Sequence, residues 1–340
     1  MLLRAGVALQ LTGYNLETGI TVHVGAQIQE AGSCVMPARL FFDIVRKLPD
    51  EMVSITVDHK QQVSIRAGAA FFQITAMDSE DYPELPDVKR QERRDHAAVR
   101  AEGHDLRHDL LRVRKIRPRP ESQTGCLMEV TEDSVTMVAV DSFRLARRTW
   151  HTENAANHTL KFVVPAAGLK EIERILEDSD EPVTFTLGDK HILFSIGDAL
   201  LVSRVLEGEF IDWRRVVPTN CGTVLTANVA ELTSSIERVS LIISEKVKSP
   251  VRCVFGDNMA DFRTANTIGS AHDTCSIAGN GGELEIGFNS RYLLDALRVI
   301  PSEEVTLELQ NGLSPIVFTP CDKKYDFAYM VLPVRLRSNS

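Results

Sequence analysis

The sequence has no apolar run of about 18 residues or more, the length that a membrane-spanning helix needs. Residues 1–6 also lack the charged region, apolar stretch and small-residue cleavage site of a signal peptide. We therefore expect a cytoplasmic protein. Of its 340 residues, 44% are apolar and 25% are charged, which is enough for two or three globular domains with a sizeable core.

Cysteine pairs of the C-x-x-C type are also absent. The six cysteines are widely scattered, which favours isolated reduced thiols over a disulfide framework or a zinc site. No metal site is expected from them. They are Cys34, Cys126, Cys221, Cys253, Cys275 and Cys321.

Common catalytic motifs are missing as well: G-x-x-x-x-G-K-[ST], G-x-S-x-G and H-E-x-x-H do not occur. The glycine-rich run at residues 279–282 precedes a strand-like segment rather than a helix, so it reads as a turn. Asp and His residues do not cluster as a catalytic triad would suggest. We therefore expect a protein that is not an enzyme, without catalytic residues or a cofactor.

The net charge of −9 argues against a nucleic-acid partner only if the charge is spread evenly over the surface. Charges of opposite sign can be segregated between two surfaces, and net charge then says little about partners. The placement of the 38 basic residues decides the question.

The most informative feature is a unit that occurs three times, at residues 33–49, 161–176 and 285–301. Each copy reads as a short apolar strand, then Pro or Asn, then a helix with apolar residues at helical spacing. Pro is tolerated at a helix start because that N–H has no partner within the helix, and Asn is a good N-cap. The anchors Pro37, Pro165 and Asn289 are 128 and 124 residues apart.

A polar turn repeats in step with this unit. Asn15, Asp141 and Asn266 lie 126 and 125 residues apart, and short alternating strands follow each helix. The pattern predicts an α+β fold of three similar domains, at residues 1–88, 89–218 and 219–336, with a tail at 337–340.

The first copy is shorter than the third. A helix that starts near Ala227 lies 39 residues before Asn266, whereas Met1 lies only 14 residues before Asn15. We therefore expect a first domain that is N-terminally incomplete by about 25 residues, a helix and part of a strand, with Met1 an internal methionine of a longer gene.

The second copy is disturbed over residues 89–120. This stretch holds 11 Lys/Arg, 5 Asp/Glu and three His, a local balance of +6. It fits a basic nucleic-acid-binding insertion, a zinc pair at His104 and His108, or sequence read out of frame. The helical and strand patterning resumes at residue 124.

Five segments of the sequence resemble bacterial DNA polymerase III beta subunits, the sliding clamps. They are residues 42–49 (FDIVRKLP), 81–86 (DYPELP), 140–146 (VDSFRLA), 206–218 (LEGEFIDWRRVVP) and 329–336 (YMVLPVRL). The resemblance covers nearly the whole chain except residues 89–123. It implies three clamp domains, with helices lining a channel and antiparallel sheets outside.

The resemblance also implies a function. A head-to-tail homodimer would encircle duplex DNA without reading its sequence and confer processivity on the replicative polymerase. The implied partners are the clamp loader and, through short linear motifs, DNA polymerases and repair proteins.

Basic residues at exposed positions of the predicted helices would together form a cationic channel. Phosphate contacts of this kind are independent of base sequence and sensitive to salt, as sliding requires. The candidates are Arg39, Arg46, Lys47, Lys170, Arg174, Arg238, Lys246, Lys248, Arg291 and Arg298.

The family's partner site lies between the second and third domains and takes an apolar peptide. Its side chains would form an apolar surface, with two arginines to hold polar groups of the peptide. The matching residues are Val140, Ser142, Phe143, Arg144, Leu145, Pro218, Val224, Leu313, Pro315, Met330, Leu332, Pro333, Val334 and Arg335.

For ring closure, the resemblance implies Phe72 and Ile74 on an edge strand, facing Leu241 and Ile242 of the partner subunit. Two alternatives remain open at this point. One is a nucleic-acid-binding regulator that acts through residues 89–120, and the other is a defective clamp fragment.

Overall fold

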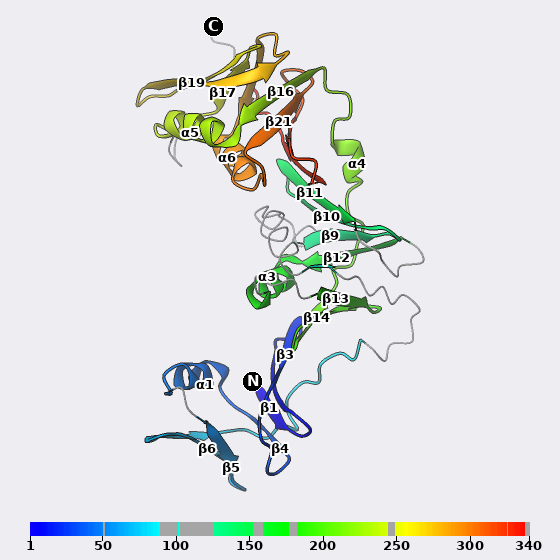
Figure 1. Cartoon of the computed structure of the whole chain (residues 1–340), viewed down its shortest axis with the longest axis vertical. Coiled ribbons are helices and arrows are strands. Elements are labelled where there is room, and N and C mark those ends of the chain that lie inside the picture. The colour runs from blue at the N-terminus through cyan, green and yellow to red at the C-terminus, as the bar shows by residue number, and fades with distance from the viewer. Residues whose placement is uncertain are drawn as a thin grey trace. The chain divides into compact units, whose positions relative to one another are not determined.

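Strand pairing is antiparallel throughout the described residues, as short strands joined by tight turns predict. The computed structural model describes residues 1–49, 52–88, 101–102, 125–151, 159–176, 182–243, 249–324 and 326–336 (Figure 1). The chain divides into two units. Unit 1 comprises residues 1–103 and 174–205, and unit 2 comprises residues 104–173 and 206–340.

Unit 1 contains an eight-stranded sheet in the order β4-β1-β2-β3-β15-β14-β13-β8 and a three-stranded sheet in the order β5-β6-β7. The strands are β1 (Leu2–Ala5), β2 (Leu9–Tyr14), β3 (Thr18–Val24), β4 (Gly32–Val35), β5 (Ser54–Val57), β6 (Gln62–Ala67), β7 (Ala70–Thr75), β8 (Ala101–Glu102), β13 (Pro182–Leu187), β14 (His191–Ile196) and β15 (Ala199–Arg204).

Helix α1 (Ala38–Val45) of unit 1 begins directly after Pro37. Its buried residues Phe41 and Ile44 pack in a core cluster with side chains from β1, β4, β6 and β7. The strand, proline and helix of the first repeat are therefore present as the sequence predicts.

Unit 2 contains a single sheet of twelve strands in the order β12-β9-β10-β11-β23-β22-β21-β16-β19-β18-β17-β20. The strands are β9 (Gly125–Val130), β10 (Ser134–Val140), β11 (Arg144–His151), β12 (Leu160–Pro165), β16 (Thr223–Asn228), β17 (Val251–Phe255), β18 (Met259–Ala265), β19 (Ser270–Gly279), β20 (Leu284–Phe288), β21 (Glu304–Leu309), β22 (Ile316–Pro320) and β23 (Asp326–Val331). The helices are α3 (Ala166–Ile175, whose last two residues fall in unit 1), α4 (Trp213–Val216), α5 (Val229–Ser240) and α6 (Ser290–Leu297).

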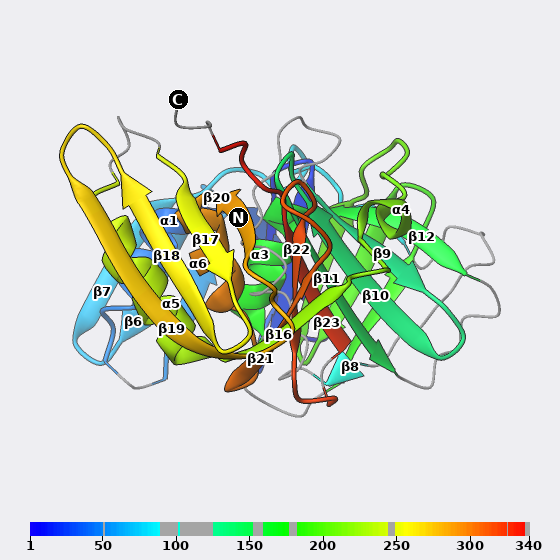
Figure 2. The ribbon, with the colours of Figure 1, turned by 90° about the horizontal axis from the view of Figure 1, so that it is seen from above.

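Helices α5 and α6 each begin at an asparagine cap. The Asn228 side chain accepts hydrogen bonds from the backbone N–H groups of Ala230 and Glu231, and Asn289 accepts one from Arg291. The two helices contact each other, and Figure 2 shows them behind β17, β18 and β19. Their apolar faces are buried at Leu232, Ile236 and Val239 on α5, and at Leu293, Leu294 and Leu297 on α6.

The three repeated polar turns have the same hydrogen-bond pattern. The side-chain oxygen of Asn15 accepts from the backbone N–H groups two and three residues later, and so do those of Asp141 and Asn266. Such Asx turns let a short polar side chain satisfy the backbone of a tight turn. The repeat found in the sequence is therefore a repeat of local structure.

Strands of different copies share sheets. In unit 1, β15 of the second copy pairs with β3 of the first, with Ala199 opposite Val22. In unit 2, β11 of the second copy pairs with β23 of the third, with Arg144 opposite Val331 (Figure 2). The second copy thus contributes strands to both units.

The basic stretch at residues 89–120 lies outside the described residues except for 101–102. The proposals of a basic insertion, of out-of-frame sequence and of a zinc pair at His104 and His108 fall on this stretch.

Candidate nucleic-acid and peptide interfaces

The predicted DNA-contacting residues lie on four helices or directly after them. Eight of the ten are described, and all eight side chains are exposed: Arg39, Arg46 and Lys47 at α1, Lys170 and Arg174 on α3, Arg238 on α5, and Arg291 and Arg298 at α6. Lys246 and Lys248 lie outside the described residues.

One of these positions carries arginine in every copy. Arg46, Arg174 and Arg298 each follow the anchors Pro37, Pro165 and Asn289 by nine residues, and all three arginines are exposed. An acidic residue stands six residues after each anchor, at Asp43, Glu171 and Asp295. The three helices therefore present the same charge pattern at their C-terminal ends.

Two of the arginines on unit 2 already have carboxylate partners. Arg238 on α5 pairs with Asp273 on β19, and this contact raises the pKa of Arg238 and lowers that of the Asp273 carboxyl. Arg298 donates to Glu237 of α5 at 3.0 Å and lies 3.9 Å from Asp295. Exposed pairs of this kind are weak, so a phosphate can compete for the guanidinium groups.

All fourteen predicted peptide-site residues belong to unit 2. Four of them have exposed apolar side chains: Phe143, Val224, Leu313 and Val334. Ser142 and Arg335 are exposed too, while Pro218, Pro315, Leu332 and Pro333 are half-buried. The remaining four are buried: Val140, Arg144, Leu145 and Met330.

Three of the buried residues, Val140, Leu145 and Met330, pack in one apolar cluster. Leu332, Phe210 and Trp213 pack against this cluster, so the linker at residues 206–217 covers part of it. These predicted residues therefore lie beneath the surface that a peptide would meet.

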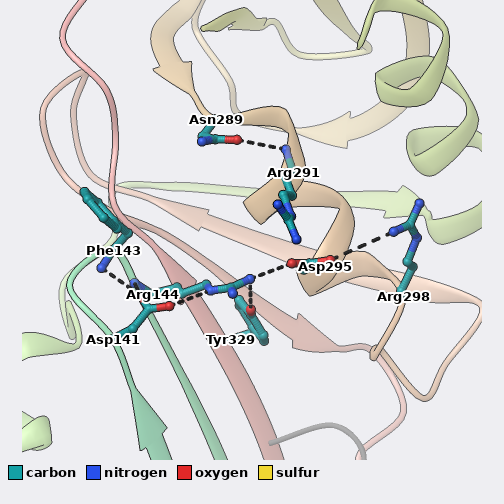
Figure 3. A network of polar contacts seen from close by, with 8 residues as sticks. All are labelled: Asp141, Phe143, Arg144, Asn289, Arg291, Asp295, Arg298 and Tyr329. Carbon is teal, nitrogen blue, oxygen red and sulfur yellow. Dashed lines mark hydrogen bonds and ion pairs between the residues drawn. The ribbon is translucent and has the colours of Figure 1, made fainter. Parts of the chain in front are cut away.

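Arg144 is enclosed by polar partners from three elements (Figure 3). Its Nε donates to Asp141 Oδ2 at 2.9 Å, and its Nη1 donates to Asp295 Oδ2 at 2.7 Å and to the Tyr329 hydroxyl at 3.3 Å. Burial alone would lower the pKa of this guanidinium, but Tyr329, Asp141 and Asp295 together raise it. In the structure Arg144 joins α6 to the sheet. Its predicted role in holding polar groups of a peptide stays a prediction.

Phe143 and Tyr292 form an aromatic pair beside this network. Their ring centroids are 5.6 Å apart at an interplanar angle of 21°, and the Arg144 guanidinium lies 4.7 Å from the Tyr292 ring centre. Stacked rings and cation–π contacts of this geometry are attractive. Neither Tyr292 nor Asp295 was among the predicted residues. Their spacing of three on α6 places them on one helix face.

The residues predicted for ring closure lie on different units. Ile74 of β7 is buried and Phe72 is half-buried against the core of unit 1. The neighbouring Phe71 is 49% exposed, and β7 is one of the two edge strands of its sheet among the described residues. Directly after α5 in unit 2, Leu241 is 83% exposed and Ile242 is half-buried.

A hollow of about 420 Å³ lies between α5 and β19, lined on one side by Glu231, Ser234 and Arg238. Cys275 lines its other side, and burial raises the pKa of this thiol to about 11. All six cysteines are free thiols, four of them buried.

The described part of the chain contains no group of three or more His, Cys, Asp or Glu residues placed to hold a metal ion. Within the same ranges, no helix is both long and apolar enough to cross a membrane.

Three family models match successive parts of the chain. Residues 2–86 match the N-terminal domain of the DNA polymerase III beta subunit, residues 120–212 its central domain, and residues 214–335 its C-terminal domain.

Whole-chain comparisons agree with these matches. The beta sliding clamp of Staphylococcus epidermidis is 29% identical over 338 residues, with 96% of this chain and 88% of the relative covered. A putative DNA polymerase III beta subunit from Eubacterium rectale superimposes with a TM-score of 0.91 at 29% identity, covering 98% of this chain and 91% of that one.

A Pseudomonas aeruginosa DNA polymerase sliding clamp determined with a ligand gives a TM-score of 0.91 at 28% identity, with 98% and 91% coverage. Together with the repeated helices and the antiparallel sheets, these matches lead to one conclusion: the chain belongs to the DNA polymerase III beta subunit family, the bacterial sliding clamps.

Proposed function

We propose that this sliding clamp encircles duplex DNA as a head-to-tail homodimer and contacts the phosphates through one arginine position that recurs in all three copies. The observation that carries the proposal is the exposure of Arg46, Arg174 and Arg298 at equivalent helix positions. Contacts to phosphate alone permit sliding, because they are the same at every base pair. The domain division at residues 88 and 218 and the clamp loader as a partner belong to this proposal.

The test is the affinity for a fluorescent 30-base-pair duplex, measured by anisotropy over a range of salt concentrations. Replacing Arg46, Arg174 and Arg298 together by alanine should weaken binding and flatten the dependence of log K on log salt. Each lost phosphate contact should reduce the slope by about 0.9. A matched control replaces Arg215 by alanine; Arg215 is exposed but lies on the linker helix α4.

An unchanged slope in the triple variant would contradict the proposed DNA surface. An equal loss in the Arg215→Ala control would show that any exposed arginine contributes, and would also contradict it. Far-ultraviolet circular dichroism of both variants checks that the fold is intact.

Ring closure is part of the same proposal. The free edge of β7 can add a strand from a second subunit, and Leu241 gives an exposed apolar side chain for that contact. Light scattering should then report twice the chain mass of 37.8 kDa. A mass of one chain at all concentrations would contradict closure.

The apolar surface around Phe143 is the proposed docking site for short linear motifs of polymerases and repair proteins. Exposed apolar groups clustered beside polar ones mark such sites. A Pseudomonas aeruginosa sliding clamp was solved bound to griselimycin, and our proposal is that this compound binds the present chain at the same surface as the motifs, so that it can serve as a probe. The alternative of a regulator that acts through residues 89–120 receives no support from the comparisons.

A further inference from the structure

The network around Arg144 joins the turn before β11 to helix α6. Asp141 belongs to that turn and Tyr329 to β23, while Asp295 is the contribution of α6 (Figure 3). The side chains of Arg144 and Asp141 are 8% and 10% exposed, and that of Asp295 is 20% exposed. A guanidinium enclosed in this way stays charged, since arginine does not deprotonate in proteins.

Phe143 is bonded directly to Arg144, and Tyr292 lies one helical turn before Asp295. Two neighbouring contacts therefore join this part of the chain to α6. Asp295 forms an ion pair with Arg144, and the Phe143 ring stacks on the Tyr292 ring. Phe143, a residue that is 52% exposed, is the part that a bound ligand can touch.

We propose that Asp295 is a positioning residue of the peptide site, holding Phe143 against Tyr292 through the Arg144 guanidinium. This inference rests on the proposed docking function of the surface around Phe143. Asp295 itself is mostly buried and acts on the ligand only through its neighbours.

The physical reason is the cost of leaving a buried charge short of a partner. Without the Asp295 carboxylate, Arg144 keeps Asp141 and Tyr329 but loses its ion pair to α6, so the guanidinium is held less firmly against the Tyr292 ring. The Phe143 ring then has several positions instead of one. Only one of these ring positions suits the bound ligand, so the apparent affinity of the ligand falls in proportion to the population of that position.

Asp295 also lies 3.9 Å from Arg298, so its effect on the peptide site must be separated from its effect on that arginine. Glu237 supplies the separation, because it lies on α5 and pairs with Arg298 at 3.0 Å. The variant Glu237→Gln is therefore a matched control, which we expect to bind griselimycin as the unaltered protein does.

The first measurement is the affinity for griselimycin by calorimetry, in the full chain. Asp295→Ala should weaken binding about tenfold, and Asp295→Asn, which keeps an acceptor oxygen, should weaken it less. In a Phe143→Ala background, Asp295→Ala should have no further effect. Equal losses with and without Phe143 would overturn the proposal, because Asp295 would then act by another route.

The second measurement does not require a ligand. With 4-fluorophenylalanine at position 143, the fluorine resonance reports the ring current of Tyr292. Asp295→Ala should move this resonance towards its position in Tyr292→Leu, and Glu237→Gln should leave it in place. An unmoved resonance overturns the proposal. Absence of griselimycin binding by the unaltered protein would instead contradict the proposed docking function.

Discussion

Glu129 on β9 is a buried carboxylate of unit 2 that anchors the segment at residues 206–217. Its side chain is 4% exposed and accepts hydrogen bonds from Arg214 at 2.6 and 3.2 Å and from Lys161 at 2.9 Å. Arg214 lies on α4, next to Trp213, whose ring packs against the apolar cluster of unit 2. We predict that Glu129→Gln destabilises this part of the protein.

The expected loss is about 2 kcal/mol in the free energy of unfolding. Hydrogen bonds to charged groups contribute about 1.5–3 kcal/mol, and an amide in this place puts an NH2 group where a carboxylate oxygen now accepts from Arg214. The loss stays below the cost of a fully buried orphaned charge, because Lys161 and Arg214 are more than half exposed and can turn to water. Lys161→Met, which removes an exposed partner, should cost about 0.5 kcal/mol.

Urea denaturation followed by tryptophan fluorescence measures both variants, since Trp150 and Trp213 are the only tryptophans and both lie in unit 2. Burial would raise the pKa of Glu129, but Arg214 and Lys161 outweigh it and lower the pKa. The stabilisation is therefore complete above the carboxyl's ordinary pKa of about 4.3 and is lost as pH falls through the lowered value. Equal losses of unfolding free energy in Glu129→Gln and Lys161→Met at pH 7 would refute this reasoning. A loss in Glu129→Gln that persists unchanged in strong acid would refute it too.

Three further predictions concern single positions. Leu241→Asp should convert the dimer to a monomer in light scattering while circular dichroism shows an unchanged fold, because the side chain is 83% exposed on the single chain; a variant that remains a dimer would contradict the proposed interface. Gly287→Ala should weaken griselimycin binding, since a Cβ there would lie 2.7 Å from the Val334 carbonyl oxygen and displace the C-terminal segment; unchanged affinity would show that this segment takes no part. Asn228→Ala should destabilise unit 2 by about 1 kcal/mol through loss of the α5 cap, whereas Asn228→Asp, which can still accept both hydrogen bonds, should retain most of the stability in the same urea titration.

Much of the architecture could be predicted from the sequence, because it depends on local interactions that recur. Pro37, Pro165 and Asn289 mark helix starts, and the spacing of Asn15, Asp141 and Asn266 marks three identical turns. Cap and turn preferences act within a few residues, so they can be read along the chain. The family and its function followed from these repeats together with five short segments.

The sharing of sheets between copies was decided only by the tertiary structure. Neither the pairing of β15 with β3 nor that of β11 with β23 has a local signal, because the edges of similar strands are chemically alike. The role of Arg144 was decided in the same way. Its neighbours in the sequence include Asp141, but Asp295 and Tyr329 lie 151 and 185 residues away.

The sequence by itself therefore determined the repeated helices and turns, an arginine nine residues after each anchor, and the family. The tertiary structure decided which predicted residues are exposed and which are buried beneath them. It places Phe143 in contact with solvent and buries Arg144. The physical reason is that burial and charge pairing depend on groups brought together by folding, and their distances in space bear no relation to their separation along the chain.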